Sequence, residues 1–282
     1  MKIIECPRDA MQGIHEFIPT DKKIEYINEL LKVGFDTIDF GSFVSPKAIP
    51  QLRDTAEVLD RLDLSNTKSK LLAIIANTKG AIEAVKHEQI AYLGFPFSIS
   101  ETFQQRNTNK SIEQALETID EIQELCIKHE KTLVTYISMG FGNPYGDPYD
   151  VDIVGEYTQT LVDKGINIIS LADTIGVSNS DNITYLYSSL QSIYPDVEFG
   201  AHLHSNPTSV VTKIEAAYRA GCKRFDGAVK GYGGCPMAED ELVGNIATES
   251  LISYLKKQGV DLKLDEEAFS KCLMLSSQIF PI

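Results

Sequence analysis

The chain has 282 residues, 43% of them hydrophobic, and a formal net charge of −14. This length and composition indicate a globular protein with either one large α/β domain or two ordinary ones. Its acidic residues are spread along the chain and its basic residues form no cluster, which argues against nucleic acid or an anionic membrane as the main partner. Five scattered cysteines without a C-x-x-C pair favour reduced thiols over disulfide bonds. The first residues carry no apolar leader and no apolar run reaches transmembrane length, so we expect a cytoplasmic protein.

Short apolar runs alternate with longer amphipathic ones along the chain, and they predict eight strands and eight helices. The predicted strands are 2–5, 35–40, 70–76, 90–98, 132–138, 167–172, 197–204 and 224–229, and the predicted helices are 21–34, 46–62, 78–87, 111–130, 152–165, 180–193, 209–221 and 239–259. This alternation indicates a parallel sheet with right-handed crossovers, and the total length suits a closed (β/α)8 TIM barrel. An open doubly wound sheet is the alternative, but the G-x-G-x-x-G turn that usually follows its first strand is absent. We expect one domain over 1–282, with the barrel at about 2–257 and a C-terminal helical extension at about 258–282.

Polar residues gather where the barrel would place its catalytic groups, just beyond the carboxyl ends of the strands. They are Arg8 and Asp9 after the first strand, Asp39 at the end of the second, Asp173 after the sixth, His202 and His204 at the end of the seventh, and Cys235 in the glycine-rich stretch after the eighth. We therefore expect these side chains to meet at one mouth of the barrel.

His202 and His204 are the first candidates for a metal site. Residues two apart in a strand face the same way, so both imidazoles can point inward, although a pair of hydrogen-bonded core histidines is the alternative. Asp9 is the natural carboxylate partner, and such a mixed nitrogen and oxygen set suits Mg²⁺ or Mn²⁺ better than structural zinc. Asn245 could add an oxygen from the start of the last helix, but its spacing alone favours an ordinary polar residue.

Arg8 and Cys235 are the candidates for the chemistry itself. The guanidinium of Arg8 could hold a substrate carbonyl or stabilise an enolate oxygen, and a simple ion pair with Asp9 or Asp39 is the alternative. Cys235 could act as a nucleophile or a general acid on a loop that its glycines allow to close, and a small buried residue in a tight turn is the alternative.

Five stretches of the sequence, in order and without a large insertion, resemble hydroxymethylglutaryl-CoA lyase, a family of TIM-barrel metallolyases. They are ECPRDAMQ, GSFVSPKAIPQL, ISLADTIGV, AHLH and GYGGCPMAEDELVGNIATE. The resemblance implies cleavage of 3-hydroxy-3-methylglutaryl-CoA to acetoacetate and acetyl-CoA, as in leucine catabolism, with Mg²⁺ or Mn²⁺ as cofactor. It implies metal ligation by Asp9, His202, His204 and Asn245, enolate stabilisation by Arg8, and protonation by Cys235. It also makes Asp173 and Glu249 supports of proton transfer or of the metal ligands, and places Gln12 and Asp39 beside the substrate.

The acyl group is less well defined than the reaction, because the chain departs from the family around the substrate. Gly13 stands where the family has Asn, Asp39 where it has Glu, and residues 205–208 where it has Asp-Thr-Tyr-Gly. Another 3-hydroxyacyl-CoA, or a 4-hydroxy-2-oxo acid cleaved without need of Cys235, is thus the alternative substrate, and a non-catalytic barrel is a third reading. Candidates for the CoA phosphates are Lys47, Lys79, Arg106 and Lys110, and a homodimer stays open.

Overall fold

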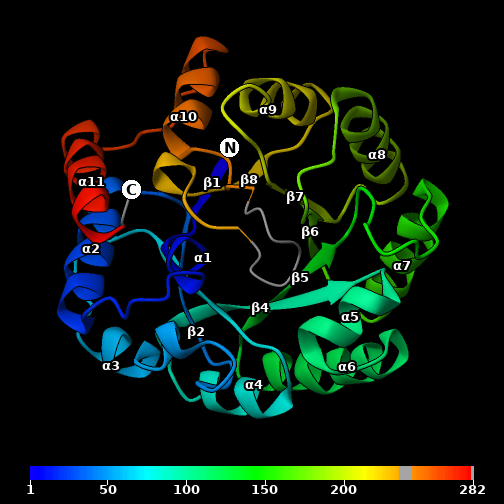
Figure 1. Ribbon diagram of the computed structural model, residues 1–282, viewed down its shortest axis with the longest axis horizontal. Helices are drawn as coiled ribbons and strands as arrows, with labels where there is room; N and C mark the ends of the chain where they lie inside the picture. Colours follow the sequence, from blue (N-terminus) through cyan, green and yellow to red (C-terminus); the bar gives the residue numbers. More distant parts are fainter. Residues whose placement is uncertain (235–242, 281–282) are drawn as a thin grey trace.

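Eight parallel strands pair in chain order and close into a barrel, with β1 hydrogen-bonded to β8, in the computed structural model, which describes residues 1–234 and 243–280 (Figure 1). The strands are β1 (Lys2–Glu5), β2 (Thr37–Ser42), β3 (Lys70–Ile74), β4 (Ile90–Ser98), β5 (Thr132–Ser138), β6 (Ile168–Asp173), β7 (Glu198–Leu203) and β8 (Arg224–Gly227). The predicted TIM barrel is therefore confirmed, and each predicted strand is present within a few residues of its expected bounds.

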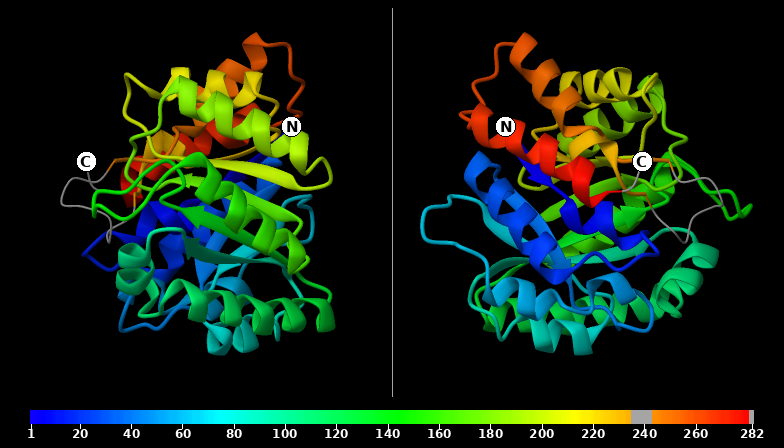
Figure 2. Two further views of the ribbon diagram at one scale, coloured as in Figure 1. Left: turned by 90° about the vertical axis from the view of Figure 1, so that its right-hand side faces the viewer. Right: turned by 60° about the vertical axis from the view of Figure 1, so that its left-hand side comes forward.

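Helices surround the barrel and cover the outer face of the sheet, except the short α1, which lies toward the centre of the ring (Figures 1 and 2). They are α1 (Pro7–Gln12), α2 (Thr20–Val33), α3 (Thr55–Asp60), α4 (Thr78–Ala84), α5 (Glu101–Thr108), α6 (Ile112–Lys128), α7 (Val151–Asp163), α8 (Ser180–Ile193), α9 (Val210–Arg219), α10 (Thr248–Lys257) and α11 (Glu266–Ile279), with 3-10 turns η1 (Pro50–Leu52) and η2 (Val229–Gly231). The long helix α6 shows why the sequence folds this way. Ser111 and Gln114 form a capping box at its start, and its buried residues recur every three or four positions.

Two predicted helices are wrong in their bounds. The expected helix 46–62 is only η1 and α3, because prolines at positions 46 and 50 supply no N–H for a longer helix. The expected helix 239–259 begins at Thr248, because the backbone just before it is extended. Asn245 and Ala247 form β-bridges there with His204 and Ala228. Two helices, α1 and α5, were not expected from the sequence.

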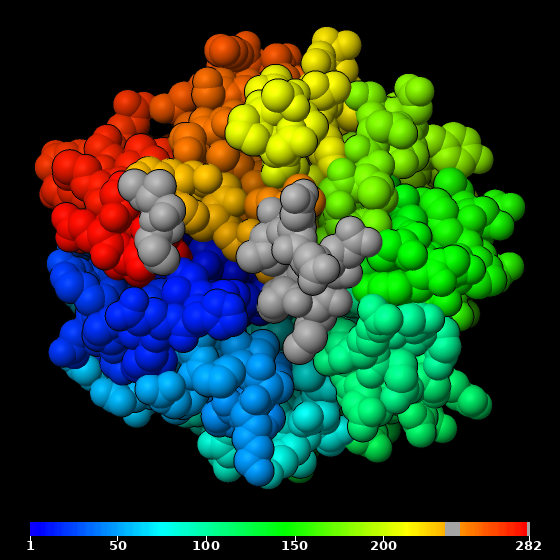
Figure 3. Space-filling view, in the orientation of Figure 1, coloured from blue at the N-terminus to red at the C-terminus, as the bar shows by residue number. Residues whose placement is uncertain are grey.

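Helix α11 lies within the range 258–282 that the sequence analysis treats as a C-terminal extension, and it packs against α2 on the outside of the barrel (Figures 1 and 3). Aromatic rings join this extension to the N-terminal part of the chain. The ring centroids of Tyr26 and Phe280 lie 5.7 Å apart, and those of Phe35 and Phe269 lie 6.1 Å apart. The last helix thus covers the first long one. Among the described helices, none combines the length and the apolar character needed to cross a membrane.

Candidate metal centre and active site

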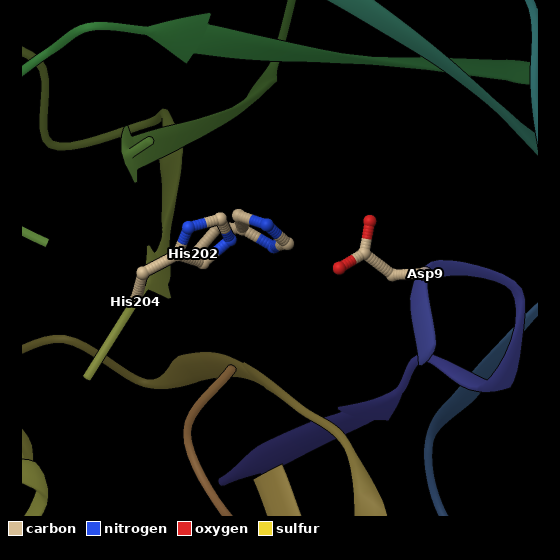
Figure 4. A group of neighbouring side chains, drawn as sticks. All are labelled: Asp9, His202 and His204. Carbon is tan, nitrogen blue, oxygen red and sulfur yellow. The ribbon is translucent and has the colours of Figure 1, made fainter. Parts of the chain in front are cut away.

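His202, His204 and Asp9 form a buried cluster inside the barrel. Their potential ligand atoms all lie within 4.8 Å of one another, and Figure 4 shows the two imidazoles beside each other with the Asp9 carboxylate opposite. His202 lies in β7 and His204 directly follows it, and the alternation of side chains turns both histidines toward the cavity, as the sequence predicts. Asp9 reaches them from α1, the short helix that directly follows β1 and has Pro7 at its first position. Residues far apart in the chain are thus brought together as expected.

The hydrogen bonds of the two imidazoles fit metal ligation. His202 Nδ1 lies 3.0 Å from Asp226 Oδ2, and His204 Nδ1 lies 2.9 Å from the carbonyl oxygen of Thr174. A carbonyl only accepts, so Nδ1 of His204 carries the proton and its Nε2 keeps a lone pair. That Nε2 is buried and has no hydrogen-bond partner among the described residues. Histidines that bind metals are oriented by such a partner on the second ring nitrogen.

Electrostatics keep two of the three ligands of the cluster, His204 and Asp9, in their cation-binding forms. Burial and the neighbouring His202 lower the pKa of His204 to about 4, which leaves its imidazole neutral at neutral pH. Burial alone would raise the pKa of Asp9, but Arg8 and the two histidines outweigh it and lower that pKa. A carboxylate and a neutral imidazole are the forms that bind a cation. Asp9 and His204 are thus in the forms that a divalent ion needs. Burial alone would lower the pKa of His202, but the hydrogen bond and charge of Asp226 outweigh it and raise that pKa, so an ion that binds there would displace a proton.

Asn245 also reaches the cluster, but not from a helix as expected. It lies in the extended segment before α10, where its Nδ2 donates to Asp9 Oδ2 at 2.6 Å and to the carbonyl oxygen of Tyr232 at 2.9 Å. The expected helical position is wrong because the backbone of His204 pairs with this segment and holds it extended.

Arg8 is fixed by three polar side chains. Its Nε and Nη2 donate to the Asp39 carboxylate at 3.0 and 2.5 Å, and its Nη1 donates to Asp9 Oδ1 at 2.8 Å and to Gln12 Oε1 at 2.9 Å. Gln12 donates in turn to Asp9 Oδ1 at 2.7 Å. Burial raises the pKa of Asp39 to about 6 against the opposing charge of Arg8. The ion pairs considered from the sequence thus exist, and they hold the guanidinium rigidly beside the histidines.

A cavity of about 400 Å³ opens beside these groups. Its polar end is formed by the cluster together with Arg8 and Gln12, and its apolar walls include Phe17, Val44, Ile49 and Phe103. Small-molecule sites have this composition, with few polar groups in a largely apolar wall. The cations expected to meet CoA phosphates do not line it, whereas Arg53 and His15 do. The expected residues were Lys47, Lys79, Arg106 and Lys110.

Asp173 and Glu249 lie outside the lining of this cavity. Asp173 pairs with Lys213 Nζ at 2.6 Å, and this lysine also donates to the carbonyl oxygen of His204 at 2.8 Å. Glu249 accepts from the backbone N–H of Lys230 at 3.0 Å. In the structure, Asp173 therefore supports the backbone that carries a histidine rather than facing the cavity. Cys235 lies outside the described residues.

Two supporting residues were missed from the sequence although each left a signal. Lys213 follows the spacing of Val210, Ile214 and Ala217, so a charged residue stands on the apolar face of a predicted helix. Asp226 stands inside a predicted barrel strand, where a carboxylate needs a partner. A buried charge within an apolar pattern was the available clue in both cases.

The comparisons with known proteins agree with this geometry. Residues 2–275 match the HMGL-like family. Hydroxymethylglutaryl-CoA lyase YngG of Bacillus subtilis is 31% identical over 265 residues, which cover 92% of this chain and 87% of that protein. The 3-hydroxy-3-isohexenylglutaryl-CoA/hydroxymethylglutaryl-CoA lyase of Pseudomonas aeruginosa is 32% identical over 269 residues, which cover 95% and 89%. An HMG-CoA lyase of Acinetobacter baumannii, solved with coenzyme A and 3-methylmalate, matches with a TM-score of 0.91 at 32% identity and covers 99% of this chain and 91% of its own.

A closed (β/α)8 barrel with a buried Asp–His–His cluster beside a cavity defines the class: a TIM barrel whose polar groups gather at one internal site. Within that class, the chain belongs to the HMGL-like family, and the relatives named above are lyases. The resemblance seen in the sequence is confirmed.

Proposed function

We propose that the protein cleaves 3-hydroxy-3-methylglutaryl-CoA to acetoacetate and acetyl-CoA and needs Mg²⁺ or Mn²⁺ for it. Asp9, His202 and His204 would hold the ion, with Asn245 as a further oxygen ligand once its amide turns. The observation that carries the proposal is the buried cluster with its lone Nε2 on His204, in a chain that matches lyases over nearly their full length. When bound, such an ion supplies a Lewis acid for the hydroxyl and carbonyl oxygens of the substrate.

Arg8 has the right form to stabilise the departing acetyl group. The reaction breaks the bond between C2 and C3 of the acyl chain, and its electron pair becomes the enolate of the thioester. A guanidinium has five N–H donors, and the bonds to Asp39, Asp9 and Gln12 leave one Nη2 hydrogen for a substrate oxygen. Because Arg8 lines the cavity and stays charged, it would stabilise the developing negative charge without moving.

Proton transfer completes the reaction. The C3 hydroxyl must lose its proton as the bond breaks, and the enolate carbon must gain one. We assign the second step to Cys235, on the strength of the GYGGCP stretch. A Cys235→Ser variant should lose most of its kcat, whereas Cys126→Ser, at a thiol buried in α6, should keep it. A Cys235→Ser variant with nearly full kcat would remove the thiol from the mechanism.

The CoA part of the substrate would leave the cavity past Arg53. The guanidinium carbon of Arg53 lies 3.5 Å from the centroid of the Phe17 ring, and the Arg53 side chain donates a hydrogen bond to the carbonyl oxygen of Pro50. Together with His15 it places basic groups at an otherwise apolar wall, which suits a phosphate group. The cytoplasmic location and the homodimer considered from the sequence stay predictions.

One assay tests the proposal. Purified protein is stripped with a chelator, reloaded with Mg²⁺ or Mn²⁺, and given a panel of 3-hydroxyacyl-CoA thioesters and 4-hydroxy-2-oxo acids. We expect acetyl-CoA to be released from 3-hydroxy-3-methylglutaryl-CoA in the reloaded sample and not in the stripped one. Release of acetyl-CoA only from another thioester would overturn the proposed substrate. Activity that survives complete removal of metal would overturn the proposed role of the ion.

A further inference from the structure

The interior of the barrel holds a buried arginine that the proposed reaction does not use. Arg224 is the first residue of β8, and its side chain is fully buried. Its Nη1 donates to Glu198 Oε1 at 3.2 Å, while its Nε and Nη2 have no partner in the part of the chain that the structure describes. Buried N–H groups of a charged side chain are costly when they are left unpaired. Something is therefore expected to accept from them.

Two further unpaired polar atoms lie close to this arginine. Ser170, Gly200 and Arg224 are neighbours in register across β6, β7 and β8. A Cβ added at Gly200 would come within 2.8 Å of Ser170 Oγ and 3.2 Å of Arg224 Cδ, so the two side chains approach each other across the glycine. Asp226 lies two residues further along β8 and faces the same side. Ser170 Oγ and Asp226 Oδ1 are buried and lack partners among the described residues.

Groups of both charge signs surround these atoms. Lys2 and Arg224 share the carboxylate of Glu198, with Lys2 Nζ at 2.6 Å and Arg224 Nη1 at 3.2 Å. Asp226 supplies a second negative charge inside the barrel. The imidazole of His202 also faces Asp226, with its Nδ1 3.0 Å from Oδ2. The unpaired atoms are N–H donors on Arg224, a carboxylate acceptor on Asp226 and the hydroxyl of Ser170. A neutral ligand that both donates and accepts hydrogen bonds can pair with all of them, and buried water forms hydrogen bonds to two to four partners.

We propose that Arg224, Ser170 and Asp226 bind buried water inside the barrel, and that Arg224 acts through this water as a positioning residue for His202. Asp226 has one oxygen, Oδ2, 3.0 Å from His202 Nδ1. Water held between its other oxygen and the guanidinium stops the carboxylate from rotating. The imidazole of His202 is then fixed with its Nε2 toward Asp9. The second half of this inference rests on the proposed cation site, and the water site does not.

A high-resolution crystal structure of the unmodified protein tests the water site. We expect a water molecule within hydrogen-bond distance of Asp226 Oδ1 and of Arg224 Nε or Nη2, with Ser170 Oγ as a further partner. A direct bond between Arg224 and Asp226, or chloride in this position, would overturn it.

Cation affinity tests the positioning role without relying on activity. Partners that touch a ligating histidine change metal affinity 10- to 100-fold, so the more remote Arg224→Met should weaken Mn²⁺ binding by about threefold to tenfold in calorimetry. Ser170→Ala, which removes one partner of the water and little volume, should weaken it by about twofold to threefold on the same reasoning. Lys70→Met is the matched control. The Lys70 ammonium lies 5.4 Å from the centroid of the Tyr92 ring, and the Arg224 guanidinium lies 5.7 Å from the same centroid. Lys70 differs from Arg224 because its ammonium donates a hydrogen bond to the hydroxyl of Tyr92.

The outcomes separate the two proposals. Folded Arg224→Met and Ser170→Ala proteins with unchanged Mn²⁺ affinity would overturn the positioning role, as would an equal loss in Lys70→Met. If Arg224→Met does not fold, Ser170→Ala decides alone. Failure of the unmodified protein to bind any divalent ion would overturn the proposed function, while the crystallographic water would still stand or fall by itself.

Discussion

Glu5 should make the protein less stable as the pH rises. It is the last residue of β1 and is fully buried, where its carboxylate accepts from the backbone N–H of Val229 at 2.9 Å and from Thr248 Oγ1 at 2.6 Å. Burial raises the pKa of this carboxyl from 4.5 to about 8, against the opposing effect of the two hydrogen bonds. The folded protein therefore keeps a proton that the unfolded chain releases.

The sign and size follow from proton linkage. Because the pKa is higher in the folded state, the fold is favoured at low pH and loses stability as the pH rises from about 4.5 through about 8. A carboxyl with these two pKa values contributes a loss of about 4 kcal/mol between pH 5 and pH 9. Glu5→Gln removes this contribution and preserves the contacts, since the amide oxygen can accept from Val229 and the amide nitrogen can donate to Thr248.

Urea unfolding at pH 5, 7 and 9 measures the effect. We expect the free energy of unfolding of Glu5→Gln to exceed that of the unmodified protein by an amount that grows with pH and reaches about 4 kcal/mol at pH 9. Glu117→Gln, at an exposed position of α6, is the control and should follow the unmodified protein. Parallel curves for Glu5→Gln and the unmodified protein would refute the reasoning.

Three further changes have defined outcomes. Arg53→Ala should raise the KM for the CoA thioester about tenfold, because it removes roughly one charged contact with a phosphate. The KM for the matching pantetheine thioester, which lacks the nucleotide phosphates, should stay unchanged. Equal effects on both substrates would rule out a phosphate contact. Asp226→Ala removes the partner of His202 Nδ1 and should weaken Mn²⁺ binding by about 10- to 100-fold, and calorimetry that shows less than twofold would contradict this role. Lys213→Met leaves the buried Asp173 without its cation and should lower the free energy of unfolding by about 3–5 kcal/mol, whereas a loss below about 1 kcal/mol would show that the pair is dispensable.

Local patterns in the sequence were enough to predict the barrel and most members of the Asp9–His202–His204 cluster. The alternation of strands and helices predicted the closed sheet, and the two-residue spacing of His202 and His204 predicted that both face inward. Asp9 could be placed because it directly follows the first strand, so few residues separate it from the mouth of the barrel. These inferences needed only short-range geometry and the rule that strand ends share one edge.

Contacts between distant segments could not be predicted in the same way. The extended conformation before α10 depends on the backbone of His204, 41 residues earlier in the chain than Asn245, so helical spacing misled there. The wall of the cavity near Arg53 depends on how η1 packs beside α1, and no periodic pattern carries that information. The partner of His202 follows from the register of β7 against β8, which only the folded barrel defines.

The bond between Asp9 and Asn245 spans 236 residues and crosses the line where the first and last strands meet. A growing chain on the ribosome therefore carries Asp9 long before Asn245 is made, whereas His204 precedes Asn245 by only 41 residues. The ring of strands can close only after β8 has been made, and the amide of Asn245 follows β8 in the chain. Any ligand of the completed site that binds only the closed barrel would therefore stabilise the closed barrel, because such a ligand shifts the equilibrium toward the form that it binds.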